Sequence, residues 1–275
     1  MVSRPDTEAM LMGHWGEEIG RGELEGLRAP RSKRHSPDHP LDSAKGVQMV
    51  AEANGIALSE PVHIANAAKN RFLTCWHAES DKWGSKLGQF DCTYRVISLD
   101  DWGKGISKRL LGGVGLSICT NHQTFGGEAM ERTKQTSGLQ DREWGMYFRF
   151  FNALDGLIRA NKQRHMMLDN LDISDGQAHD IFCRMLLDHL VNPAGMAELL
   201  GHWYEPEHDE FKARNGQSVF QAFTSRNRGR TLWKSGERDN RALEIIDTVS
   251  GVSEPVVEVT DKTALQADRL RPMVG

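Results

Sequence analysis

The chain has 275 residues, of which 39% are hydrophobic and 26% are charged, and its formal net charge is −4. That charge disfavours a protein that coats nucleic acid through bulk charge, although it permits a local basic groove. No apolar run approaches the roughly 18 residues of a membrane span, and none of the four cysteines has the CxxC spacing of a zinc ribbon.

The first 41 residues predict a flexible arm that is basic and rich in proline. It contains the run Arg31-Ser32-Lys33-Arg34 and four prolines. The N-terminus carries acids and glycines rather than the apolar core of a secretory signal peptide. We therefore expect a cytoplasmic protein, in a compartment where its cysteines stay reduced.

The segment after the arm predicts one helix followed by strands. A helix over Ala44–Ala53, capped by Asp42 or Ser43, would end at Asn54-Gly55. The predicted strands are Ile56–Leu58, Val62–Ala65, Arg71–Trp76 and Cys92–Ile97. Leu110–Cys119 is ambiguous, because Leu116 and Ile118 favour a strand whereas three glycines favour a tight turn.

The second half has helical periodicity instead. The predicted helices are Trp144–Leu168, Ala178–Val191, Ala194–Leu200 and Gln217–Ser225, with Ser174 as a cap for the second. A strand over Val256–Val259 precedes a polar tail. The chain therefore predicts an α+β fold, with a mainly antiparallel sheet in the N-terminal half packed against helices concentrated in the C-terminal half. One domain would span residues 42–251, and residues 252–275 would form the strand and tail.

Three common catalytic and nucleotide-binding motifs fail on particular residues. A phosphate-binding P-loop ending at Gly103-Lys104 would need glycine where Ser98 stands. A dinucleotide fingerprint fails at Lys108 or Ile118, and a nucleophile elbow around Ser117 fails at Cys119. We therefore assign no catalytic residue, no cofactor and no metal.

The segment Asp100–Arg109 is the first candidate for binding phosphate. It combines two carboxylates and Trp102 with three cations, Lys104, Lys108 and Arg109. Glycines beside cations let a backbone approach a phosphate closely. The alternative is a solvated hairpin loop with mixed charges.

The segment Arg226–Arg241 is the second candidate. Its cations are interleaved with Phe220, Phe223 and Trp233, a combination that suits phosphates and stacked bases. The alternative is an amphipathic segment whose aromatic side chains enter the core. Its cations are Arg226, Arg228, Arg230, Lys234, Arg238 and Arg241.

The acidic and histidine residues of the chain also suggest a metal site. Asp100 or Asp101 could combine with His202, Glu205 or His208 from the acidic stretch Gly201–Phe211. Adjacent side chains on a strand face opposite ways, so Asp100 and Asp101 should not share one ion. The stretch itself is typical of an acidic surface loop.

The stretch from Val96 to Asn121 also carries a family resemblance. It is similar to the phage and plasmid-like proteins grouped as domain of unknown function 932, which have a short loop followed by an apolar strand ending in Cys-x-Asn, here Cys119 and Asn121. A late FQAFTSRN motif ending at Asn227 resembles that family's aromatic pattern, whereas Gln135 stands where the family has histidine. The resemblance covers roughly residues 42–250 and implies a phage or mobile-element origin, which would place the protein in the host cytoplasm. It brings no established catalytic residues.

These observations predict a DNA-metabolism protein that binds nucleic acid without catalysis, in replication or recombination. Single-stranded DNA is the favoured partner, with binding or annealing as the activity and a homo-oligomer as a possible form. The alternatives are a metal-dependent enzyme acting on nucleic acid or nucleotides, and a module that binds a host factor. The predicted nucleic-acid contacts are Trp102, Lys104, Lys108, Arg109, Arg226, Arg228, Arg230, Trp233 and Lys234.

Overall fold

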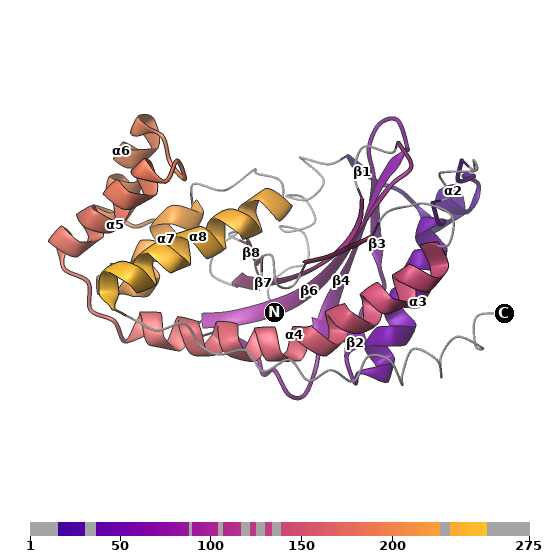
Figure 1. Cartoon of the computed structure of the whole chain (residues 1–275), viewed down its shortest axis with the longest axis horizontal. Helices are drawn as coiled ribbons and strands as arrows, with labels where there is room; N and C mark the ends of the chain where they lie inside the picture. Colours follow the sequence, from indigo (N-terminus) through magenta and orange to yellow (C-terminus); the bar gives the residue numbers. More distant parts are fainter. Residues whose placement is uncertain are drawn as a thin grey trace.

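The structure, a computed structural model, describes residues 16–30, 37–87, 90–103, 107–116, 122–124, 130–133, 139–225 and 232–251. It has an α+β fold in which an antiparallel sheet comes from the N-terminal half and most helices come from the C-terminal half (Figure 1). The predicted fold class is therefore confirmed. Within the described ranges, no helix is long and apolar enough to cross a membrane.

The sheet has the strand order β1-β3-β4-β6-β7-β8, with β2, β5 and β9 pairing with β4, β6 and β7 respectively. Every pair is antiparallel. The strands are β1 (Glu17–Glu18), β2 (Ala57–Leu58), β3 (Val62–Ala65), β4 (Arg71–Glu79), β5 (Lys86–Leu87), β6 (Phe90–Asp101), β7 (Lys108–Leu116), β8 (His122–Thr124) and β9 (Met130–Thr133).

The helices fall into two groups, one beside the sheet and one beyond it. Beside the sheet are α2 (Arg21–Glu25), α3 (Pro40–Ala53) and the first part of α4 (Leu139–Asp169). Beyond it are α5 (Asp175–Leu187), α6 (Pro193–Tyr204), the 3₁₀ helix η2 (Asp209–Ala213), α7 (Gly216–Ser225) and α8 (Leu232–Ser250). We call this second group, with the end of α4, the helical lobe.

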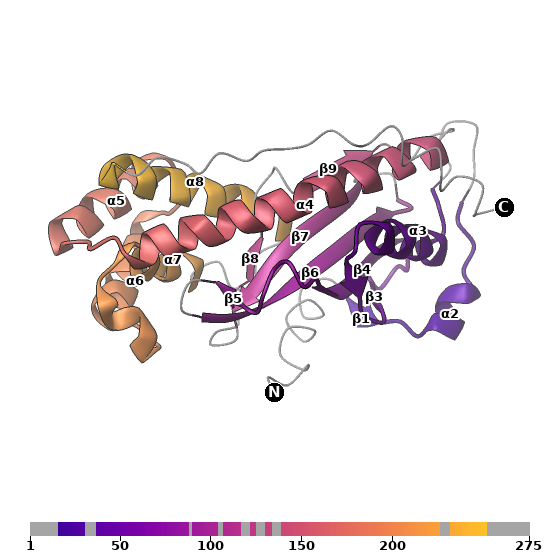
Figure 2. The ribbon, with the colours of Figure 1, turned by 90° about the horizontal axis from the view of Figure 1, so that it is seen from below.

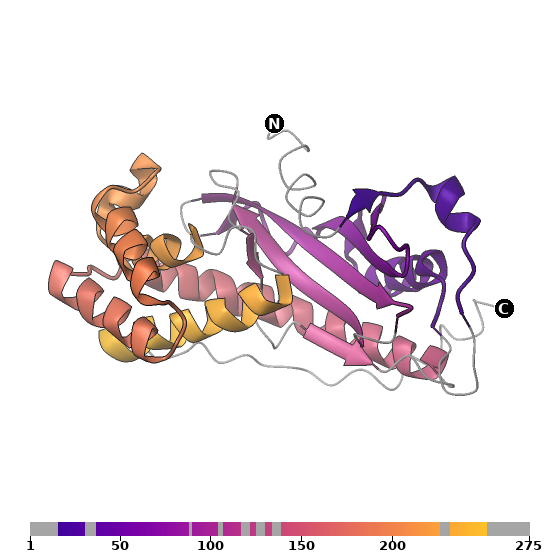
Figure 3. The same cartoon turned by 90° about the horizontal axis from the view of Figure 1, so that it is seen from above.

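The long helix α4 joins two hydrophobic cores. Figures 2 and 3 show it running along one face of the sheet and continuing into the helical lobe. Phe150 and Leu154 lie in the first core, together with Trp76 and Val96 of the sheet. Leu168, near the end of α4, belongs to the second core with residues of α5 to α8. One continuous helix therefore fixes the helical lobe against the sheet.

Alternation along the strands gives the sheet two different faces. Side chains such as Trp76, Val96 and Leu110 point toward α3 and α4, on what we call the helix face. Their neighbours in sequence point to the other side because successive side chains in a strand alternate. A second apolar cluster with Leu73 and Ile97 lies on this opposite face.

Several boundaries differ from those predicted. Helix α3 begins at Pro40 rather than Ala44, because the His39 imidazole caps it by accepting a hydrogen bond from the Leu41 amide. Strand β6 extends to Asp101 and β7 begins at Lys108, so the ends of the predicted loop at 100–109 belong to strands. The predicted cap at Ser174 is confirmed, as a capping box with Gln177.

Three further differences concern whole elements. Strand β1 and helix α2 lie within the first 41 residues, which the sequence predicts as an arm, and Leu24 of α2 is fully buried. Helix α8 occupies much of the stretch predicted only as a basic segment. The predicted strand Val256–Val259 and the residues Cys119 and Asn121 lie outside the described part of the chain.

Candidate functional site

Lys108, one of the predicted phosphate contacts, lies in the core. Its side chain is 0% exposed, and its ammonium group bonds to Glu143 on α4 and to the Ser43 hydroxyl on α3. The Asp100 carboxylate on β6 lies 3.1 Å from the same nitrogen. The prediction that Lys108 contacts a phosphate therefore needs correction: its position on the helix face turns the charge away from solvent.

The charges around Lys108 balance when Glu143 holds a proton. Burial raises the pKa of Glu143 to about 9, and the nearby Asp38 carboxylate adds to this, although Lys108 opposes it. The pKa of Lys108 is raised well above its usual value by Asp100, Tyr147 and Glu143, which outweigh its desolvation. At neutral pH the cluster is thus one ammonium, one carboxylate and one neutral carboxyl group.

This cluster is not arranged for nucleophilic catalysis, even though it contains a serine bonded to a lysine. A lysine that activates a serine must be neutral, which requires a lowered pKa. Here the two carboxyl groups hold Lys108 in its charged form, and both Lys108 and Ser43 are buried. The cluster joins α3, α4, β6 and β7, so its effect is to fix the helices on the sheet.

Trp102 is also buried rather than available for stacking on a base. Its ring packs edge-on against Phe72, with centroids 4.6 Å apart, and its indole N–H donates to the Asp38 carbonyl at 3.1 Å. The Trp102 side chain is only 7% exposed. The tryptophan therefore closes the edge of the core near α3, and its predicted role in stacking is corrected.

Arg109, by contrast, lies on the opposite face of the sheet because it follows Lys108 directly in β7. Two more arginines share that face by the same alternation, Arg71 on β4 and Arg95 on β6. Arg132 on β9 is the register partner of Arg109. We call the surface carrying Arg71, Arg95 and Arg109 the arginine face.

The arginine face contains one buried carboxylate. Asp101 is the register partner of Arg71, and its Oδ2 lies 3.3 Å from the Arg71 Nε. Its other oxygen accepts a hydrogen bond of 2.6 Å from the Gly103 amide. Asp100 and Asp101 therefore serve opposite faces of the sheet, as the alternation of side chains along a strand predicts.

Access differs across the arginine face. The Arg71 side chain is 43% exposed and Arg109 is half-buried, whereas Arg95 is buried. Leu73, Ile97 and Leu111 in the middle of the face are buried as well. A ligand can therefore reach Arg71 directly, and it reaches Arg95 only if the atoms that cover the centre move.

The other predicted contacts are only partly placed. Lys104, Arg226, Arg228 and Arg230 lie outside the described residues. Trp233 and Lys234 belong to the first turn of α8, which lies against β8 of the sheet. Of the later arginines, Arg238 bonds to the Leu190 carbonyl and Arg241 to Asp188 and Glu244, so both stabilise the helical lobe.

The residues of the predicted metal site do not form one. Asp100 and Asp101 are engaged as described above, while His202 lies on α6 and Glu205 and His208 follow it in the helical lobe. Within the described ranges, no group of three or more histidine, cysteine or acidic side chains could hold a metal ion.

Some relevant residues could have been found from the sequence and others could not. Arg71 and Arg95 stand at positions of the predicted strands that alternate with apolar residues, a pattern that marks one face. No sequence signal links Glu143 to Lys108, because 35 positions separate them.

Fold and geometry thus define the class as an α+β protein with an arginine-bearing sheet face and a helical lobe. No protein-family model, curated protein or solved structure matches the chain. The resemblance to domain of unknown function 932 therefore stays a prediction.

Proposed function

We propose that the protein binds nucleic acid without catalysis, foremost single-stranded DNA, through the arginine face. The observation that carries this proposal is the presence of Arg71, Arg95 and Arg109 on three hydrogen-bonded neighbouring strands, on one face. Guanidinium groups bind phosphate oxygens in a planar, bidentate way and stack on bases. The face thus presents Arg71 and Arg109 to one strand of nucleic acid, and Arg95 becomes accessible when the atoms that cover the centre of the face move.

The spacing of these arginines suits an extended polyanion. Arg109 is level with Leu99 in β6, four residues from Arg95, so the two lie about 13 Å apart along the strand direction. Arg71 lies across β6 from Arg109, two strands away. The three cations thus span several nucleotides.

The described part of the second basic segment adjoins the same sheet. Helix α8 follows the run Arg226–Arg230 and lies against β8, a member of the same sheet. Lys234 and Trp233 in its first turn are therefore attached to an element beside the sheet. Single-strand binding and annealing in phage DNA metabolism, with a homo-oligomer as the active form, extend this proposal.

The test is salt-titrated binding of the full chain to a 30-nucleotide single-stranded DNA, the corresponding duplex and the same sequence as RNA. For single-stranded DNA we expect the slope of log affinity against log salt to become shallower by roughly 0.7 for each phosphate that the protein no longer neutralises. Arg71→Gln and Arg109→Gln should each weaken binding severalfold and reduce this slope.

Arg159→Gln is the matched control. Arg159 is an exposed arginine on α4 that pairs with Asp155 in the preceding turn. Its replacement removes one positive charge, as the other two substitutions do, but at a position away from the arginine face. Melting temperatures of all variants show whether the fold is kept. If all three variants bind alike, or if the intact chain shows no salt-dependent binding to any of the three nucleic acids, the proposal fails.

A further inference from the structure

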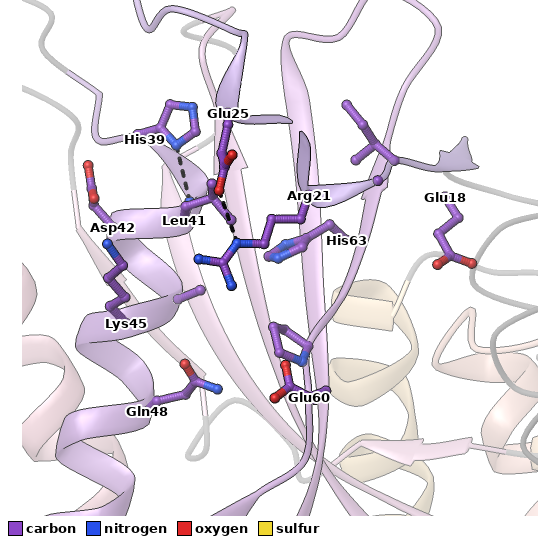
Figure 4. A pocket seen from close by; sticks show the side chains of 14 residues that line it. Glu18, Arg21, Glu25, His39, Leu41, Asp42, Lys45, Gln48, Glu60 and His63 are labelled. Carbon is purple, nitrogen blue, oxygen red and sulfur yellow. Dashed lines mark hydrogen bonds and ion pairs between the residues drawn. The ribbon is translucent and has the colours of Figure 1, made fainter. Parts of the chain in front are cut away.

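A cavity of about 570 Å³ lies between α2, the first turns of α3, the edge strand β1 and its neighbour β3 (Figure 4). This volume is within the range of sites that bind small organic molecules. The cavity is separate from the arginine face, because His63 on its wall alternates with Val62 and Ile64, which belong to the apolar cluster on that face. Nothing in the nucleic-acid proposal uses it.

His63 is the buried polar group of this cavity. Its side chain is 94% buried, since 6% is exposed, and its Nδ1 lies 3.0 Å from the Thr74 hydroxyl. The Thr74 hydroxyl is itself buried and has no other hydrogen-bond partner among the described residues. We therefore expect it to donate its hydrogen bond to the His63 Nδ1, which accepts. We therefore assign the ring proton to Nε2, which has no protein partner in the described part of the chain.

The His63 ring stays neutral at physiological pH. Burial lowers its pKa to about 4, and Arg21 and His39 lower it further by their proximity. His39 does not compete for a ligand, because its Nε2 is bonded to the Leu24 carbonyl at 3.0 Å and its Nδ1 caps α3. Figure 4 shows the His63 ring beside the Arg21 side chain, so the two offer neighbouring N–H donors.

Acceptors lie on the same cavity wall and across from it. Glu60 precedes β3 and Gln48 projects from α3, and Figure 4 shows both toward the same end of the cavity, away from His39. The Glu60 carboxylate has no ion-pair partner among the described residues. Arg21, in contrast, is oriented by Glu25 at 3.0 Å. The cavity thus has the Arg21 and His63 donors at one end, with Glu25 paired to Arg21, and the Glu60 and Gln48 side chains at the other end.

The charges of the lining exclude two simpler ligands. Four carboxylates (Glu18, Glu25, Asp42 and Glu60) face two cations (Arg21 and Lys45), so a dianion would enter a region of net negative charge. A dication would place one ammonium group against Arg21 and the His63 N–H. A molecule with one charge of each sign satisfies both ends.

We propose that this cavity binds a small zwitterion, with its carboxylate on Arg21 and the Nε2–H of His63 and its ammonium group on Glu60. Carboxylates accept hydrogen bonds from guanidinium and imidazole groups, and an ammonium group donates to carboxylate and amide oxygens. The proposal concerns the two end groups, and the length of the molecule between them is left to the test.

The test compares ligands of one length that differ only in their end groups. Calorimetric titration of the full chain, without nucleic acid, uses 4-aminobutyrate, 1,3-diaminopropane and glutarate, each with three methylene groups between its end groups. Glycine and 6-aminohexanoate vary the separation of the charges. We expect at least one zwitterion to bind roughly tenfold or more tightly than both the diamine and the dicarboxylate, since each of those two lacks one charged hydrogen bond.

Substitutions then locate the site. Glu60→Gln and Arg21→Gln change exposed side chains, so the fold is kept, and each should weaken binding of the zwitterion roughly tenfold. Glu52→Gln, an exposed position on α3 outside the cavity, is the control and should leave binding unchanged. If no zwitterion binds, if the diamine or glutarate binds equally well, or if Glu52→Gln has the same effect as Glu60→Gln, the proposal is wrong.

Discussion

Each end of α4 is anchored by a cluster of buried polar side chains, and the two clusters offset the energetic cost of that burial in different ways. Near its beginning, Glu143 meets Lys108 and Asp100 of the sheet, so charge is balanced by charge. Near its end, His165 donates from Nδ1 to Gln217 of α7 at 2.7 Å and packs against the Phe220 ring. This second pair contains no ionised group at neutral pH, because burial lowers the pKa of His165 and the Gln217 amide carries no charge.

The second cluster is also less complete. The His165 Nε2 and the Gln217 side-chain nitrogen are buried without a hydrogen-bond partner among the described residues. Burial lowers the pKa of His165 to about 4, and nearby Arg164 adds to this, against the hydrogen bond to Gln217. A titratable side chain can thus be buried either beside an opposite charge or in its own neutral form. The stability that the two clusters contribute changes with pH in opposite directions.

The largest expected effect tests the charged cluster. Replacing Lys108 by methionine leaves Asp100 buried without its cation, which should lower the free energy of unfolding by about 3–5 kcal/mol. Urea unfolding at pH 7 measures this. Lys82→Met, at an exposed position, is the control and should change stability by less than about 0.5 kcal/mol. Equal unfolding midpoints for the two variants would show that Lys108 is not held by buried partners.

The next effect tests the neutral cluster at acid pH. His165 has a lower pKa in the folded than in the unfolded chain, so the unfolded chain binds more protons between about pH 6.5 and 4. Stability should therefore fall as pH falls through this window, by about 3 kcal/mol from His165.

His165→Leu should remove part of this acid sensitivity, measured as urea midpoints between pH 7 and 4. His63 has a similarly lowered pKa and keeps its own contribution in the same window. A variant with the full acid sensitivity of the original chain would contradict the assignment to His165.

The smallest expected effect, that of Glu143→Gln, tests whether Glu143 is protonated in the charged cluster. If Glu143 is protonated at pH 7, glutamine is close to it in shape and charge, and Glu143→Gln should change stability by less than about 1 kcal/mol. Its pKa is raised in the folded chain, so the folded chain binds more protons between about pH 4.5 and 9. Stability should therefore fall as pH rises in the original chain, and Glu143→Gln should lessen this fall. A destabilisation at pH 7 as large as that of Lys108→Met would mean that Glu143 is ionised.

Elements with a local pattern could be predicted from the order of residues alone. Alternation predicts Val62–Ala65 with its observed bounds, and helical periodicity predicts Trp144–Leu168 within α4. It also places Asp100 and Asp101 on opposite faces of a strand. Hydrogen bonding to near neighbours and burial of one face dictate such features, so a short window of residues contains the signal.

Which charges are buried depends on the packing of distant segments. Lys108 and Arg109 form one basic patch if they belong to a loop, but as members of β7 they face opposite sides. Two features depend on segments that are far apart in the chain. One is the ion pair of Lys108 with Glu143, and the other is the cavity enclosed by residues of α2, α3 and β3. Packing of α3 and α4 on the sheet brings these groups together, and local periodicity carries no information about such contacts.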